Sequence, residues 1–201
     1  MEPGPGREAL TLDSFPEQLP RWRERTRGAW AAQLRHLLRL AASAHPQDAY
    51  GRSDLLVMAA GRADDLGHRG LAGGLLALAC AFEEDRVLSA RAHLLRRTLD
   101  LDGQEEARQL SEAWRRDRSC SVRDHGRIAQ IWADRDDHVY AWGWCQRGLL
   151  LAEELGVGGV TLRGLLHLRA DILACLDREP PEPLDPGCLC LSCAPGSWVA
   201  A

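Results

Sequence analysis

Apolar residues recur along most of this chain at intervals of three, four and seven, which is the spacing of one face of an α-helix. After Pro20, for example, Trp30, Leu34, Leu37 and Ala41 follow this spacing. No stretch of the sequence shows the sustained alternation of apolar and polar residues, rich in β-branched side chains, that indicates a strand. The sequence therefore predicts an all-α fold of about eight helices.

Glycine, proline and capping residues divide this pattern into the predicted helices. The first follows Pro20 and ends at His45–Pro46, and the second begins at Ser53 or Asp54, either of which can cap it. The remaining six are expected over residues 69–84, 86–100, 104–117, 122–134, 137–155 and 159–177.

The chain divides by composition into three parts. Residues 1–19 carry Pro and Gly and are predicted to be an irregular leader. Residues 20–177 hold all the predicted helices and are expected to form one helical-repeat domain. Residues 178–201 are rich in Pro and Cys, and we expect this tail to be disordered.

Two stretches of the sequence resemble each other. Residues 63–67 and 74–78 form one of them, and residues 152–156 and 164–168 form the other. Each consists of a helix end, a glycine turn and the start of a new apolar helix. Repeated helix pairs are expected to stack, because one pair cannot bury its apolar face alone.

The clearest repeat lies over residues 125–156. Its first helix carries a bulky apolar residue, a small residue and an aromatic residue, and its second helix carries small residues that allow two helices to approach. The matching residues are Ile128, Ala129 and Trp132, followed by Ala141, Cys145 and Gly148. In these positions the chain resembles the tetratricopeptide repeat family.

Further copies of this pattern extend the resemblance over about 53–177. A second copy over 72–103 matches at Leu75, Leu78, Ala79 and Phe82 and then at Leu95, Leu99 and Leu101. It has Arg91 where a small residue is expected. A third, partial copy starts at Gly164 and includes Leu165, Leu168 and Ile172, with Arg169 at the small position. The alternative interpretation is a generic helical bundle with Leu and Ala seams.

The resemblance implies stacked antiparallel helical hairpins, a TPR-like α-solenoid, whose groove binds a partner peptide or protein. Polar residues of the first helices would line this groove; the candidates are Arg123, Arg127, Gln130, Asp134, His167 and Asp171. Arginine favours ligands that carry carboxylates. In the alternative, these residues are only a solvated face. We expect an adaptor or regulatory protein rather than an enzyme.

The tail contains Cys188, Cys190 and Cys193, which are close enough in sequence to bind zinc. Zinc takes four ligands, so a fourth would come from Cys175, from a histidine or from a second chain. A redox-sensing tail and a tail without any such role are the alternatives. We predict no cofactor other than this possible zinc ion.

A second group of metal-ligand residues comprises Asp124, His125, Asp134 and the run Asp136–His138. Histidine and aspartate pairs occur in helical metal sites, but such sites need ligands from several helices. Capping explains the aspartates better, because negative charge is favourable at the start of the helix predicted over 137–155. No Ser or Cys occurs in a recognisable nucleophile motif.

Charge argues against a nucleic-acid partner, since the net charge is -4 and the pI about 6.0. The first predicted helix is nevertheless locally basic, with arginines at Arg21, Arg23, Arg25, Arg27, Arg35 and Arg39. Nucleic-acid binding by this helix is therefore the alternative function. All 25 residues in the Lys and Arg total are Arg. A GC-rich coding sequence explains this lysine-free composition, and selected escape from lysine-directed tagging is the alternative.

No apolar run approaches 18 residues, so the sequence predicts no membrane span. Residues 1–20 lack the basic start and apolar centre of a secretory signal. We therefore expect a cytoplasmic protein that binds another protein or peptide.

Overall fold

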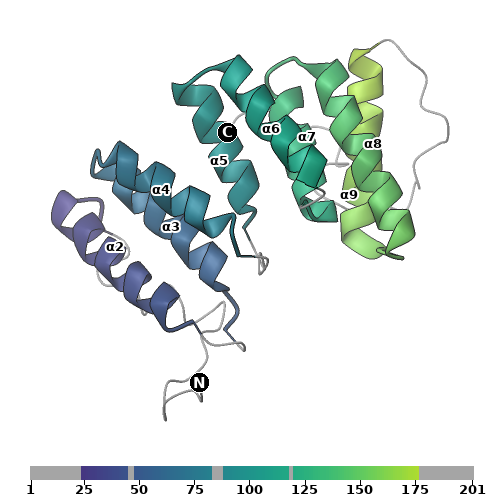
Figure 1. The fold of residues 1–201 in the computed structure, drawn as a ribbon. Coiled ribbons are helices and arrows are strands. Elements are labelled where there is room, and N and C mark those ends of the chain that lie inside the picture. The colour runs from purple at the N-terminus through teal and green to yellow at the C-terminus, as the bar shows by residue number, and fades with distance from the viewer. Residues whose placement is uncertain (1–23, 45–47, 83–87, 118–119, 177–201) are drawn as a thin grey trace. The chain divides into compact units, whose positions relative to one another are not determined.

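The computed structural model describes residues 24–44, 48–82, 88–117 and 120–176 (Figure 1). Within these ranges the regular structure consists of eight helices and contains no strand, so the all-α prediction is confirmed. The helices are α2 Arg27–Ala42, α3 Arg52–Asp65, α4 Arg69–Ala79, α5 Ala90–Leu101, α6 Gln104–Asp117, α7 Val122–Ala133, α8 His138–Glu154 and α9 Gly159–Cys175. No helix in the described part is long and apolar enough to cross a membrane.

The first two helices begin elsewhere than the sequence predicts. Helix α2 begins at Arg27, because the Thr26 hydroxyl caps it by accepting from the Ala29 N–H at 3.2 Å. Helix α3 begins at Arg52 with Gly51 as its N-cap. Asp54 lies inside the helix, where its carboxylate accepts from the Gly51 N–H at 2.8 Å. Both local hydrogen bonds, rather than the apolar spacing, set these ends.

Helix α4 ends earlier, and helix α5 begins later, than the sequence predicts. Helix α4 ends at Ala79 rather than at residue 84. Helix α5 begins at Ala90 rather than at residue 86, because the Ser89 hydroxyl accepts from the Ala92 N–H at 3.1 Å and caps it. Leu78 was expected on the apolar face of its helix, but it is half exposed.

Two expected turns are found. Gly67 follows α3 and Gly156 follows α8, with φ angles of +82° and +62°. A β-carbon is unfavourable in this left-handed region, so glycine is the suitable residue at both turns. The Asp137 carboxylate accepts from the Tyr140 N–H at 3.2 Å, which confirms that it caps α8.

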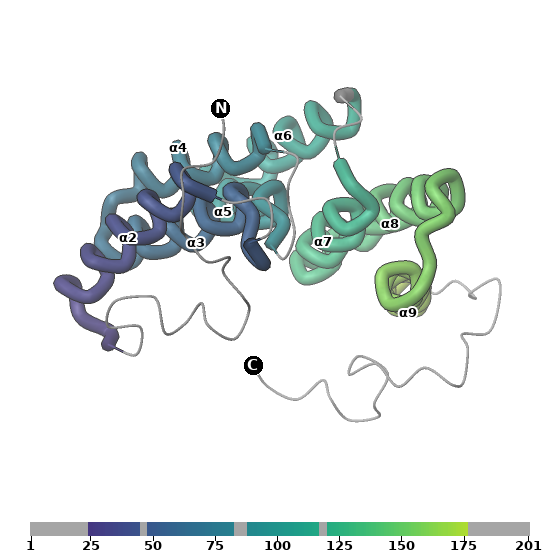
Figure 2. Tube along the Cα trace, turned by 90° about the horizontal axis from the view of Figure 1, so that it is seen from below, coloured from purple at the N-terminus to yellow at the C-terminus, as the bar shows by residue number. Residues whose placement is uncertain are grey.

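The helices form two compact units, residues 1–104 and residues 105–201. In the first unit, consecutive helices are antiparallel: Arg52 at the start of α3 donates to the Ala41 carbonyl at the end of α2 at 3.0 Å. The Ser53 hydroxyl likewise donates to the Ala79 carbonyl at the end of α4 at 3.1 Å. Helix α3 packs against α2, α4 and α5, and Leu37 and Leu55 are buried in this core (Figure 2).

In the second unit, α7 packs against both α8 and α9, and α8 also packs against α9. Ile128, Trp132, Trp144 and Ile172 are almost completely buried and form the centre of these contacts. The edge of the Tyr140 ring meets Trp132, with 4.7 Å between ring centroids, and this contact closes the end of the α7–α8 hairpin. The second unit therefore contains the α7–α8 hairpin with α9 packed against it, together with nearly all of α6.

Candidate functional site

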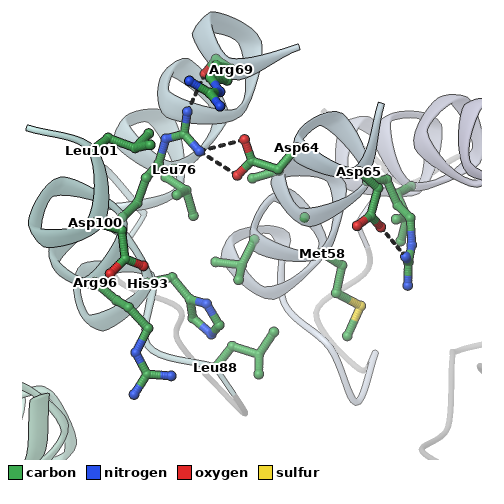
Figure 3. Close-up of a pocket in the computed structure, with 16 residues that line it drawn as sticks. Met58, Asp64, Asp65, Arg69, Leu76, Leu88, His93, Arg96, Asp100 and Leu101 are labelled. Carbon is green, nitrogen blue, oxygen red and sulfur yellow. Dashed lines mark hydrogen bonds and ion pairs between the residues drawn. The ribbon is translucent and has the colours of Figure 1, made fainter. Parts of the chain in front are cut away.

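The first unit contains a pocket of about 620 Å³ (Figure 3). Helices α3 and α5 form its two sides, and α2 and α4 contribute to its base. Figure 3 shows Met58 of α3 and His93 of α5 on opposite sides of the pocket. The apolar residues that line it are Leu37, Val57, Met58, Ala60, Leu76, Leu88 and Leu101. Their surface can accept an apolar group from a ligand.

Charged side chains surround the apolar part of this pocket. They are Arg62, Asp64, Asp65, Arg69, Arg96, Arg97 and Asp100, and His93 adds an imidazole to the lining. Both signs of charge are present, so the pocket can orient a ligand by charge as well as by shape. Among exposed residues, Leu101 at the end of α5 is 47% accessible and adds apolar surface beside the opening.

Arg97 holds one edge of the pocket in place. Its Nη1 atom lies 2.5 Å from both carboxylate oxygens of Asp64, which links α5 to α3. Its Nη2 atom donates to the Arg69 carbonyl at 2.7 Å, which links α5 to α4 (Figure 3). The side chain of Arg97 is 14% exposed, whereas that of Asp64 is 39% exposed, so this three-helix connection is partly open to water. Arg97 therefore links α3, α4 and α5 at one edge of the pocket.

The predicted groove residues lie on α7 and α9, two helices that pack against each other. Arg123 and Arg127 are exposed on α7 and Asp134 is exposed at its C-cap, where it accepts from the Gln130 side chain at 2.8 Å. On α9, His167 lies close enough to oppose the rise in the pKa of Asp171 that partial desolvation causes. The structure thus places the six residues on two adjoining helices. They do not line the α3–α5 pocket.

A short distance from these residues, α7 and α8 approach each other closely. A β-carbon added at Gly148 would lie 2.8 Å from the His125 β-carbon and 3.2 Å from Leu165 Cδ2. Ala141 and Cys145 are also buried on this face of α8. The small residues singled out in the sequence are therefore those that allow the helices to approach.

The Asp124–His125 pair lies at the start of α7, where Asp124 takes part in capping the helix. Asp124 Oδ2 accepts from the Ser121 N–H at 2.9 Å, and the Ser121 hydroxyl accepts from the Asp124 N–H at 3.1 Å. His125 Nδ1 lies 2.8 Å from the Ser121 carbonyl, and the imidazole contacts the Trp144 ring. Burial lowers the pKa of His125, so this imidazole is neutral near pH 7.

Other candidate ligands for a metal are dispersed. His138 Nε2 is 3.9 Å from Asp136 Oδ1, and Asp137 is used as a helix cap. In the part of the chain that the structure describes, no three His, Cys, Asp or Glu side chains are grouped to hold a metal ion. Cys188, Cys190 and Cys193 lie outside the described residues, as do Arg21 and Arg23 of the basic segment.

Two arginines that depart from the repeat pattern have specific partners. Arg91 is buried and donates to the Cys80 carbonyl at 3.5 Å. The Arg169 guanidinium lies over the Trp142 ring, 5.8 Å from its centroid. Each large side chain is therefore accommodated by a neighbouring helix or turn at a position where a small residue was expected.

Comparison of the chain with protein-family models, with curated proteins and with solved structures found no match. A functional assignment therefore depends on the geometry of the chain's own residues. The α3–α5 pocket was not predicted from the sequence, because Leu37, Val57, Leu76 and Leu101 come from four different helices. The run Asp64–Asp65 indicated only a helix end.

Proposed function

We propose that this chain is a protein-binding module, an adaptor or regulatory protein, whose α3–α5 pocket receives an apolar side chain of a partner peptide or protein. The observation that carries this proposal is an open pocket of about 620 Å³ that is lined by apolar residues from four helices and by charged residues of both signs. Burial of one Leu or Phe side chain there would contribute about 1.5–3 kcal/mol to binding. Such a module would act in the cytoplasm by binding alone, without catalysis.

The packing of the helices supports the TPR-like part of this proposal. In both units, helices that are two apart in the chain touch: α3 contacts α5, and α7 contacts α9. In a TPR-like stack, the first helices of successive pairs lie side by side and line the groove. Within the first unit this pattern favours α3–α4 as one pair and α5 as the first helix of another. Within the second unit it favours α7–α8 as a pair and α9 as the first helix of another.

These pairs differ from the sequence match over 72–103, which joins α4 to α5. The contact of α3 with α5 favours α5 as the start of a pair instead. The α3–α5 pocket then lies between two first helices, which is where a ligand would bind. Arg127 and Gln130 of α7 and His167 of α9 belong to first helices of the second unit, so they remain candidates for partner contacts within that unit.

Two leucine substitutions test the proposal in a matched way. Leu101 lines the pocket and Leu78 does not, yet they are 47% and 50% exposed and both lie on helices of the first unit. Leu101→Asp places a charge beside the apolar surface, whereas Leu78→Asp makes the same change elsewhere. Circular dichroism at 222 nm confirms that both variants are folded before binding is measured.

The measurement is affinity capture from the native extract, with quantitative mass spectrometry of the retained proteins. We expect a protein that is retained by the unchanged chain and by Leu78→Asp but lost with Leu101→Asp. If every retained protein is equally abundant with both variants, the pocket is not the binding site and the proposal fails. Retention of only nucleic acid, released as salt rises, would also contradict it.

A further inference from the structure

Helices α6 and α8 are joined by a row of polar contacts in the second unit. Arg108 of α6 pairs with Asp137 at the start of α8, with 2.5 Å between Nη2 and Oδ2. One turn further along, the Tyr140 hydroxyl donates to Glu112 Oε1 at 2.7 Å. Both contacts advance in the same chain direction, so the two helices run roughly parallel. In each of these contacts a donor meets a carboxylate.

Two cations lie beyond these contacts. Arg115 lies about one turn after Glu112 on α6, Arg147 lies about two turns after Tyr140 on α8, and both line a pocket of about 400 Å³. Burial and then repulsion from Arg115 lower the pKa of the Arg147 guanidinium, while Glu112 and Tyr140 oppose this change. The two preceding contacts each pair a donor with a carboxylate, whereas Arg115 and Arg147 are two positive charges that repel each other.

Arg147 is the less compensated of the two arginines. Its Nη1 atom donates to the Gly143 carbonyl of its own helix at 3.0 Å, and no carboxylate among the described residues forms an ion pair with it. The nearby Glu112 is already held by Arg115 and by the Tyr140 hydroxyl. The row thus lacks one anion at this position.

Gly143 leaves room for that anion. It lies on α8 one turn before Arg147 and lines the same pocket. A β-carbon at this position would already lie 3.5 Å from Arg147 Nη1, so any larger side chain would occupy the space beside the guanidinium. The pocket is therefore open where the positive charge is least compensated.

We propose that the α6–α8 pocket binds a phosphate group, with Arg147 and Arg115 donating hydrogen bonds to its oxygens. Phosphate as a dianion matches the two cations, and its terminal oxygens can accept from two guanidinium groups at once, whereas a carboxylate is satisfied by one. Arg115 can turn toward the ligand, because its pair with Glu112 lies on one helix and is partly exposed, and such pairs contribute little to stability.

Isothermal titration calorimetry of the full chain with inorganic phosphate, in a buffer low in chloride, tests this proposal. We expect saturable binding that weakens about tenfold or more in Arg147→Gln, because hydrogen bonds to a charged group are lost. Arg163→Gln is the matched control, since Arg163 is an exposed arginine of α9 outside the pocket. It should bind phosphate as the unchanged chain does.

A second variant keeps the test independent of folding defects. Arg147→Glu supplies the missing carboxylate beside Arg115, so we expect it to fold and to lose phosphate binding. Phosphate should raise the thermal midpoint of the unchanged chain and leave that of Arg147→Glu unaltered.

The same titration with phosphoserine and with adenosine monophosphate identifies which carrier of the phosphate group binds most tightly. Absence of saturable phosphate binding, an equal loss in Arg163→Gln, or acetate binding as tight as phosphate binding would each overturn the proposal.

Discussion

Substitution of Gly148 by alanine should destabilise the second unit, although alanine is normally the better helix former. The new β-carbon would lie 2.8 Å from the His125 β-carbon, so α7 and α8 must separate by about 0.6 Å before contact becomes ordinary at 3.4 Å. The obstructing atom is attached directly to the α7 backbone, so a change of rotamer cannot remove the clash. Overpacking of this kind costs about 1–3 kcal/mol, and the gain in helix propensity offsets about 1 kcal/mol.

We therefore expect Gly148→Ala to lower the free energy of unfolding by about 1 kcal/mol. Gly164→Ala is the matched control, because nothing lies within 4 Å of its added β-carbon in α9. That variant should gain about 0.5–1 kcal/mol from the replacement of glycine inside a helix. The two substitutions thus have opposite signs.

Urea unfolding followed by tryptophan fluorescence measures the difference, since Trp132 and Trp144 are buried at the α7–α8 contact. A gain of stability in Gly148→Ala that equals the gain in Gly164→Ala would refute the reasoning. It would mean that α7 and α8 are not in close contact at Gly148, and the match to a TPR-like pair would lose its structural basis.

Three further predictions concern single buried groups. Asp54→Ala should lower the free energy of unfolding by about 1–3 kcal/mol in urea titrations, because the Gly51 and Leu88 N–H groups, at 2.8 and 2.6 Å, lose their acceptor. Burial places the pKa of His125 in the folded chain below 6.5, so the free energy of unfolding should fall as the pH drops through 6.5. The thermal midpoint of His125→Gln should change less over the same pH range than that of the unchanged chain. Burial raises the pKa of Cys145 to about 12, so peptide mass mapping should find iodoacetamide on exposed Cys175 long before Cys145.

Much of the helical fold could be predicted because its signals are local. Apolar spacing located each helix, and glycine marked the turns at Gly67 and Gly156, where φ is positive. The errors occurred where a single polar side chain sets the end of a helix. Thr26 and Ser89 cap α2 and α5, and neither hydrogen bond leaves a signature in the apolar period.

The pockets could not be predicted, because they depend on contacts between residues far apart in the sequence. Arg97 forms one edge of the α3–α5 pocket only through its contact with Asp64, 33 residues earlier. The pairing of Tyr140 with Glu112 likewise spans 28 residues. The repeat pattern did locate Gly148, because a small residue at a fixed position is itself part of the pattern.

Site-specific photocrosslinking tests the central claim most directly, namely that the α3–α5 pocket binds a partner protein. Benzoylphenylalanine is placed at Leu101 beside the pocket or at Leu78 as the control, and the chain is irradiated in its native extract. We predict that one partner is crosslinked from position 101 and not from position 78. The same crosslinked proteins from both positions, or none from position 101, would contradict the claim.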